Sequence, residues 1–219
     1  AKTTRDPRIA QRATEVALLS RKPIQALSAA KIWVELDSDS ILAHQTIAAL
    51  LVSSNRLDEA QVYLDRLLDL EGDAAKFFVQ LNNLLARSAN KIETLQLVQQ
   101  FAKPYSQVPE AHFAIAQAAS LAGQFETARQ EMELALTLRP DWEMAAIYNG
   151  RLLRHHVSSE SAIEFYESYL KVNPKANKAR IAFAQMLVAE KNFTMARGHF
   201  KQLLAQNSGD ANVAIAVGL

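Results

Sequence analysis

Two adjacent histidines, His155 and His156, are the residues of this sequence that first invite a metal-site interpretation. Side chains at successive positions of a helix point about 100° apart, so this pair cannot bind one metal ion without distortion, unlike histidines spaced by four residues. Cysteine is absent, which removes thiolate metal sites, disulfides and a cysteine nucleophile. The sequence therefore predicts no metal and no cofactor.

Three glutamates, Glu126, Glu131 and Glu133, have the side chains of acid–base catalysts. No histidine or second carboxylate is placed by its spacing to converge with them, so we expect solvated charges on a helix. The sequence also lacks a glycine-rich phosphate loop and a G-x-S-x-G motif. We expect no catalytic residue in this chain and no enzymatic activity from it.

A different pair of histidines is formed by His44 and His112, whose numbers differ by twice 34 (112 − 44 = 68 = 2 × 34). If the chain repeats at a step of 34, two helical layers of about 10 Å each separate the two rings. They cannot share a ligand at that distance. We expect both histidines in the core.

A basic cluster offers a more attractive chemistry. Arg151 and Arg154 are three residues apart, which places them on one face of a helix, and Lys178 begins the equivalent helix of the next repeat. We hypothesise that these cations contact acidic groups of a partner. The alternative is a basic patch that serves only solubility.

The overall charge excludes one class of partner. Lys and Arg (24) nearly cancel Asp and Glu (23), so there is no positive field to collect phosphates, and we expect no nucleic-acid binding. No run of about 18 apolar residues occurs, and we expect no membrane span. With 219 residues, 49% of them hydrophobic, the chain is long enough to bury a sizeable core.

Helices must position these side chains. Only 6 Gly and 6 Pro interrupt the chain, and apolar residues recur at steps of three and four, as in Ile9, Ala13, Val16 and Ala17. Small residues also fall on a regular grid, whose nodes follow one another at a constant step of 34. The nodes are Ala26, Ala60, Thr94, Ala128, Ala162 and Ala196.

Neighbouring positions keep the same period. Ala116, Gly150 and Ala184 are small residues twelve positions before a grid node, where they let two helices approach closely. Pro140 and Pro174 stand twelve positions after a node, where they end a helix. Each unit therefore contains two helices of roughly a dozen residues, and stacked units bury the apolar stripes that one hairpin leaves exposed.

The predicted fold is all-α, a right-handed superhelix of about six helical hairpins in one array over residues 1–219. The repeats are expected at approximately 7–40, 41–74, 75–108, 109–142, 143–176 and 177–208. Residues 210–219 are expected to begin a further, unpaired helix. Because the chain starts with Ala1 and stops inside that apparent helix, we expect it to be a fragment of a longer protein.

This arrangement resembles the tetratricopeptide repeat family. Residues 109–140 match it best: Ile115 and Ala116 stand for its Leu-Gly pair, Ala128 for a close-packing site and Pro140 for its terminator. The next unit departs from the pattern at Asn149, where the family has a large apolar residue. A buried Asn149 needs a hydrogen-bond partner.

The resemblance implies a binding surface for a protein or peptide, because in that family the first helix of each hairpin lines a concave groove. Amide, aromatic and arginine side chains on that side suit an extended or helical peptide. The alternative is that these side chains form solvated helix faces that bind no ligand. The implied groove residues are Gln11, Glu15, Gln45, Gln80, Asn83, Arg87, Phe113, Gln117, Tyr148, Arg151, Arg154, His155, Lys178 and Gln185.

Two functions from different classes follow. The first is a protein-binding adaptor that helps to assemble a multiprotein complex. The second is a structural array that forms a homo-oligomer or spaces the domains of a longer protein, using Val213, Ile215 and Val217 of the terminal helix as its contact.

The opening segment, TRDPRIAQRATEVAL, resembles long multi-repeat proteins that Gram-negative bacteria export to their envelope. The resemblance favours a bacterial envelope location, in the periplasm or at the outer membrane, with the cytoplasm as the alternative.

Overall fold

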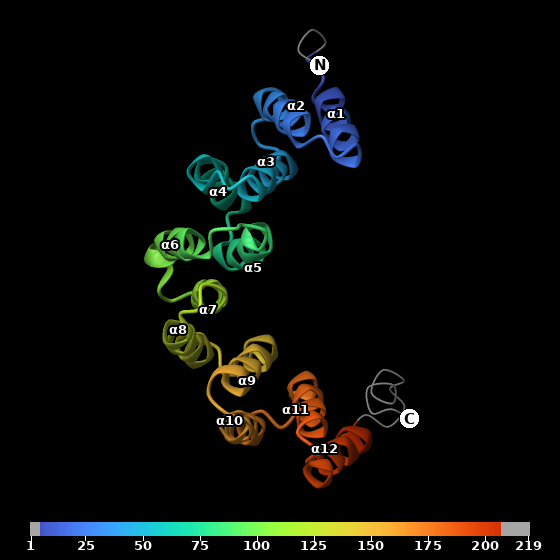
Figure 1. Cartoon of the computed structure of the whole chain (residues 1–219), viewed down its shortest axis with the longest axis vertical. Helices are drawn as coiled ribbons and strands as arrows, with labels where there is room; N and C mark the ends of the chain where they lie inside the picture. Colours follow the sequence, from blue (N-terminus) through green and yellow to red (C-terminus); the bar gives the residue numbers. More distant parts are fainter. Residues whose placement is uncertain (1–4, 207–219) are drawn as a thin grey trace. The chain divides into compact units, whose positions relative to one another are not determined.

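The computed structural model describes residues 5–206, which form helices joined by short turns (Figure 1). No strand occurs within that range, so the predicted all-α class is confirmed there. The expected helix at 210–219 lies outside the described residues. The helices are α1 (Pro7–Leu19), α2 (Pro23–Leu36), α3 (Ile41–Ser53), α4 (Leu57–Glu71), α5 (Ala74–Leu85), α6 (Lys91–Ala102), the 3₁₀ turn η1 (Lys103–Tyr105), α7 (Pro109–Leu121), α8 (Phe125–Leu138), α9 (Glu143–His156), α10 (Ser159–Val172), α11 (Asn177–Ala189) and α12 (Phe193–Gln206).

The chain divides into two compact units, residues 1–123 and residues 124–219. In the first unit α1 packs on α2 and α3 packs on α4, while α5 lies against both α3 and α7. In the second unit α9 packs on α10 and α11 packs on α12, and α9 also lies beside α11. The single array and its six repeat boundaries stay predictions.

Short polar side chains begin many of these helices. Asp6 accepts a hydrogen bond from the backbone N–H of Arg8 at 2.9 Å, and Pro7 follows it at a position that needs no donor. Asp73, Asn90 and Ser158 cap α5, α6 and α10 in the same way. These caps bond backbone donors that have no partner inside the helix.

The turns that follow α1, α3, α7 and α11 repeat one backbone conformation at the step of the alanine grid. Arg21 (φ 54°), Asn55 (φ 57°), Gly123 (φ 75°) and Lys191 (φ 60°) all lie in the left-handed region. Their numbers differ by multiples of 34. Glycine adopts this conformation without steric cost and asparagine tolerates it, whereas at Arg21 and Lys191 it costs energy that the packing of the helices must offset.

The grid residues are all buried, with relative exposures of 0–3%. In the first unit Thr94 takes the place of alanine, and its hydroxyl donates to the carbonyl of Asn90 at 2.7 Å, so no buried polar group is left without a partner there. Ala116 and Ala184 are fully buried as well. Pro140 and Pro174 lie exposed just beyond the ends of α8 and α10.

Gly150 lets α10 come close to α9. A Cβ atom at this position would overlap the ring of Tyr166, which is 1% exposed. The Tyr166 ring is stacked on Phe183 with centroids 5.0 Å apart, and its hydroxyl donates to the carbonyl of Ile147 at 3.3 Å. A larger residue at position 150 therefore requires the tyrosine to shift and to disturb its contacts with Phe183 and Ile147.

Three equivalent side chains tie a helix to the turn before it. His44 Nε2 lies 2.9 Å from the carbonyl oxygen of Ser38, and His112 Nε2 lies 3.0 Å from that of Ser106, in each case six residues earlier. Arg180 makes the same contact, because its Nη2 donates to the carbonyl of Pro174 at 2.8 Å. His44 is buried as expected, whereas His112 is only half-buried.

Candidate functional site

Amide side chains bridge the first helices of neighbouring hairpins in the first unit. Gln45 on α3 donates to Gln80 on α5 at 2.8 Å, and Asn82 on α5 donates to Gln117 on α7 at 2.6 Å. Both pairs join residues 35 positions apart. Each bond uses one donor or one lone pair of an amide that has several, so these half-buried side chains keep capacity for a ligand.

The other groove residues predicted in this unit divide by exposure. Gln11 and Glu15 hydrogen-bond to each other along α1 at 3.2 Å and are half-buried. Asn83 and Arg87 are exposed on α5 and just beyond its end. Phe113 does not belong to this surface: it is 5% exposed, because its side of α7 turns into the core. An aromatic residue at that position packs the hairpin and presents no ring to a ligand.

In the second unit a small pocket of about 190 Å³ gathers three of the predicted residues. Arg151 and Arg154 come from α9, Tyr166 comes from α10 and Gln185 comes from α11. Ala182 and Met186 complete the lining. Tyr148, also predicted, is half-buried earlier on α9.

The two arginines of this pocket differ in their pairing. Arg154 Nε donates to Glu190 Oε1 at 2.8 Å, which joins α9 to the end of α11. Arg151 is exposed and forms no ion pair with another residue in the described range. Burial raises the pKa of Tyr166 to about 12, an effect that the nearby charge of Arg151 opposes. Arg151 is therefore the cation that remains available to an acidic group.

The structure separates Lys178 from the arginines. Glu143 Oε2 at the start of α9 accepts a hydrogen bond from the backbone N–H of Ala179 at 2.9 Å, so the beginnings of the two helices lie together. Lys178 is thus about 10 Å along α11 from Gln185, at about 1.5 Å per residue. Of the basic cluster predicted from the sequence, Arg151 and Arg154 lie together at the pocket, and Lys178 lies apart from them at the start of α11.

His155 is exposed and lies edge-on to His156, with ring centroids 6.4 Å apart. His156 stacks on Phe125 instead, at 3.5 Å. Within residues 5–206 no three histidine or acidic side chains come together as metal ligands would. No helix in that same range is long and apolar enough to cross a membrane.

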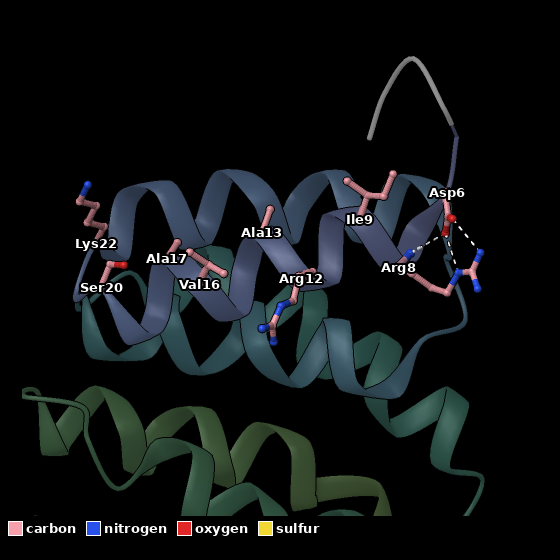
Figure 2. Close-up of a pocket in the computed structure, with 9 residues that line it drawn as sticks. All are labelled: Asp6, Arg8, Ile9, Arg12, Ala13, Val16, Ala17, Ser20 and Lys22. Carbon is pink, nitrogen blue, oxygen red and sulfur yellow. Dashed lines mark hydrogen bonds and ion pairs between the residues drawn. The ribbon is translucent and has the colours of Figure 1, made fainter.

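An open surface along α1 is one that the groove prediction missed. This open depression has a volume of about 840 Å³. All nine residues that line it come from α1 and the turns at its two ends (Figure 2). Ile9 (43% exposed) and Val16 (48%) form an apolar stripe with Ala13 between them. The spacing of these three residues was the signal in the sequence. Gln11 and Glu15 do not line this surface.

Known proteins resemble this chain in sequence. The family model for the tetratricopeptide repeat matches residues 109–141. This stretch, which contains α7 and α8, is similar to one tetratricopeptide repeat. A TPR repeat-containing protein of Pseudomonas aeruginosa is 24% identical over 184 residues, which cover 84% of this chain and 31% of that protein. The chain thus spans about a third of the length of this relative.

Solved structures share the repeat fold at low sequence identity. Yeast Tom70 superposes with a TM-score of 0.55 and 17% identity, over 89% of this chain and 42% of its own. PilW, a type IV pilus biogenesis factor, superposes with a TM-score of 0.52 and 17% sequence identity. The match covers 96% of this chain and 98% of PilW. The C-terminal part of a TPR repeat-containing protein from Cytophaga hutchinsonii superposes with a TM-score of 0.52 and 14% sequence identity. The match covers 98% of this chain and 89% of that one.

Proposed function

We propose that this tetratricopeptide array binds a protein or peptide partner along the first helices of its hairpins and serves as an adaptor in a multiprotein assembly. The family match supports an interaction scaffold. The observation that carries the proposal is the pocket between α9 and α11, where Arg151 and Gln185 flank a buried tyrosine.

The chemistry of this pocket suits an acidic side chain of a peptide. The guanidinium of Arg151 offers donors in a planar fork that fits a carboxylate, and the Gln185 amide adds donors and an acceptor. Met186 and Ala182 supply apolar contact beside these polar groups. Such a mixture of one arginine, one amide and an apolar floor is typical of the anchoring points of protein interfaces.

The test is a charge reversal at Arg151. We expect Arg151→Glu to weaken binding of acidic peptides on a peptide array, by about tenfold or more, because a charge-assisted hydrogen bond is replaced by repulsion. Lys178→Glu makes the same change in net charge outside the pocket and should have a much smaller effect. Equal losses in both variants would show only a general response to charge and would contradict the proposal.

Arg154 is a poor choice for that reversal. Its partner Glu190 would then face a second carboxylate across the α9–α11 contact, so weaker binding would be mixed with a loss of stability. Arg151 has no such partner in the described range, which is why it gives the cleaner variant.

Self-association is the second candidate function, and the exposed stripe on α1 favours it. Besides Ile9 and Val16, Leu19 is 81% exposed at the end of the same helix. If copies associate through this stripe, Val16→Glu should lower the average mass measured by light scattering. A protein that stays monomeric at all concentrations would dispose of this candidate. The predicted contact through Val213, Ile215 and Val217 lies outside the described residues.

A further inference from the structure

Position 149 breaks the pattern of the repeats in a way that leaves a pocket. The equivalent residues in four other repeats are Ile47, Leu81, Ile115 and Phe183, all apolar and all buried at 0–8% exposure. Asn149 takes that place on α9 and is 9% exposed. The expected hydrogen-bond partner is not found: within the described chain no other residue bonds to its side chain.

The pocket beside Asn149 holds about 440 Å³ and is formed by three helices of the second unit. Leu136 of α8, Leu153 of α9 and Phe165 of α10 supply apolar contact, and Arg129, Glu133 and Thr137 of α8 also line the pocket. This volume is within the range of about 300–1,000 Å³ that small ligands occupy in proteins. The side chain of Asn149, which bonds to no other described residue, lines this space together with three apolar side chains.

This pocket is distinct from the Arg151 site. Residues 149 and 151 are two positions apart on one helix, so their side chains point about 200° apart around its axis. Asn149 and Leu153 face α8 and α10, whereas Arg151 and Arg154 face α11. The same helix therefore carries a site on each of two opposite faces.

The two charged residues that line the pocket, Arg129 and Glu133, carry opposite charges. Arg129 Nη2 lies 2.7 Å from Glu126 Oε1, and Arg129 Nη1 lies 3.9 Å from Glu133 Oε2. A charged ligand would meet both signs and gain little from either. The arrangement therefore favours an uncharged occupant with apolar bulk and one polar group that reaches Asn149.

We propose that this pocket binds a segment of a partner protein by accepting one uncharged apolar side chain, while a peptide amide next to it hydrogen-bonds to Asn149. An amide carries both an N–H donor and a carbonyl acceptor, and so complements the donor and the acceptor of the asparagine amide. The apolar part of the side chain replaces water against Leu136, Leu153 and Phe165. This site adds a second contact to a partner-binding array and does not depend on Arg151.

The test uses two small probes with a leucine-like side chain. Isocaproamide carries a primary amide, and methyl isocaproate is the matched ester without an N–H donor. Titration of isotope-labelled protein with isocaproamide should shift the NMR signals of the Leu136 and Leu153 methyl groups and of the Asn149 side-chain amide. The ester should bind about tenfold more weakly, because it cannot donate to Asn149.

The variant Asn149→Leu places at this position the kind of residue that the other repeats have, so it should fold. We expect it to lose affinity for isocaproamide by about tenfold or more. Asn83→Leu makes the same chemical change at an exposed position of α5 and should leave binding unchanged. Arg151→Glu, on the other face of α9, should also leave it unchanged, which separates this proposal from the function proposed above.

Two results would overturn the proposal. One is the absence of any shift in the pocket signals up to the solubility limit of the probes. The other is equal binding of amide and ester, or of the wild-type protein and Asn149→Leu, since the asparagine would then contribute nothing to recognition.

Discussion

His44, His112 and Arg180 occupy equivalent positions in three repeats, and each bonds to the backbone carbonyl six residues before it. The spacing of His44 and His112 predicted that both lie in the core, which holds for His44, but it contained no sign of the carbonyl that each approaches. Arg180 was missed because arginine is rarely buried, although here it is 3% exposed. What this position requires is a donor of the right reach, and two chemically different residue types supply it.

The fit between Gly150 and Tyr166 gives the first prediction. Gly150→Ala should lower the free energy of unfolding by about 1–3 kcal/mol, because the added methyl overlaps a ring that Phe183 and the surrounding helices hold in place. Urea denaturation followed by circular dichroism measures this as a lower midpoint at an unchanged slope.

Gly198 in α12 provides the matched control. A Cβ atom there would have nothing within 4 Å, so Gly198→Ala should raise stability by about 0.5–1 kcal/mol through helix propensity alone. If Gly150→Ala were as stable as the wild type, the tyrosine would not be confined as we describe.

The helices themselves could be predicted from the sequence because apolar spacing and the period of 34 depend only on residue type. Contacts between helices could not. Gln45, Gln80 and Gln117 were placed on one surface, yet the bonds joining Gln45 to Gln80 and Asn82 to Gln117 depend on how far α3, α5 and α7 are displaced along one another. Phe113 was placed on that surface too, although its side chain is buried.

The same limit explains the basic cluster. Residue spacing put Arg151, Arg154 and Lys178 on the first helices of neighbouring repeats, but not at the same level. The bond from Ala179 to Glu143 and the ion pair of Arg154 with Glu190 set that level. Asn149 was recognised as a departure from the pattern, whereas the pocket beside it depends on the shapes of Leu136 and Phe165, which residue spacing does not reveal.

The contact between α11 and α12 gives a prediction for pH. His199 of α12 packs on Phe183 and accepts a hydrogen bond at Nδ1 from Arg180 Nη1 at 3.5 Å. Burial, and then the charge of Arg180, lowers the pKa of His199, while Glu167 opposes the shift. Because the unfolded state takes up the proton more readily, stability falls as pH falls through the ordinary value of 6.5.

Urea midpoints at about pH 7.5 and about pH 5.5 measure this loss. In His199→Gln, whose side chain does not titrate, the midpoint should fall by a smaller amount between the two pH values. An identical fall in both proteins would assign the pH dependence to other groups, such as paired carboxylates.

At the scale of the whole molecule, stability in a repeat protein is a sum over units and their interfaces, so a helix with one uncovered side is the weakest. On α1 the outer stripe of Ile9 and Val16 is exposed, whereas Ile47 and Leu51 of α3 are fully buried. The amides of α1 should therefore exchange with deuterium sooner than those of α3. Hydrogen-exchange mass spectrometry on dilute protein makes the comparison.

Protein concentration serves as the control for that measurement. If protection of α1 rises with concentration while that of α3 does not, copies of the chain cover the stripe, and self-association is the reason. If α1 is as well protected as α3 in dilute protein, the exposed stripe does not weaken this end. The sequence predicted the stripe but not its exposure, since helical periodicity is the same for a covered and an uncovered helix.

Ionisation of Tyr166 and Tyr169 supplies an ultraviolet absorbance signal from the second unit. Burial raises the pKa of each phenol to about 12, whereas an unperturbed tyrosine has a value near 10.0. In alkaline solution between these values both residues remain protonated while the α9–α10 hairpin is closed, and they ionise when it opens. Opening of this hairpin then adds the absorbance of two tyrosinates to that of Tyr63, Tyr105 and Tyr148.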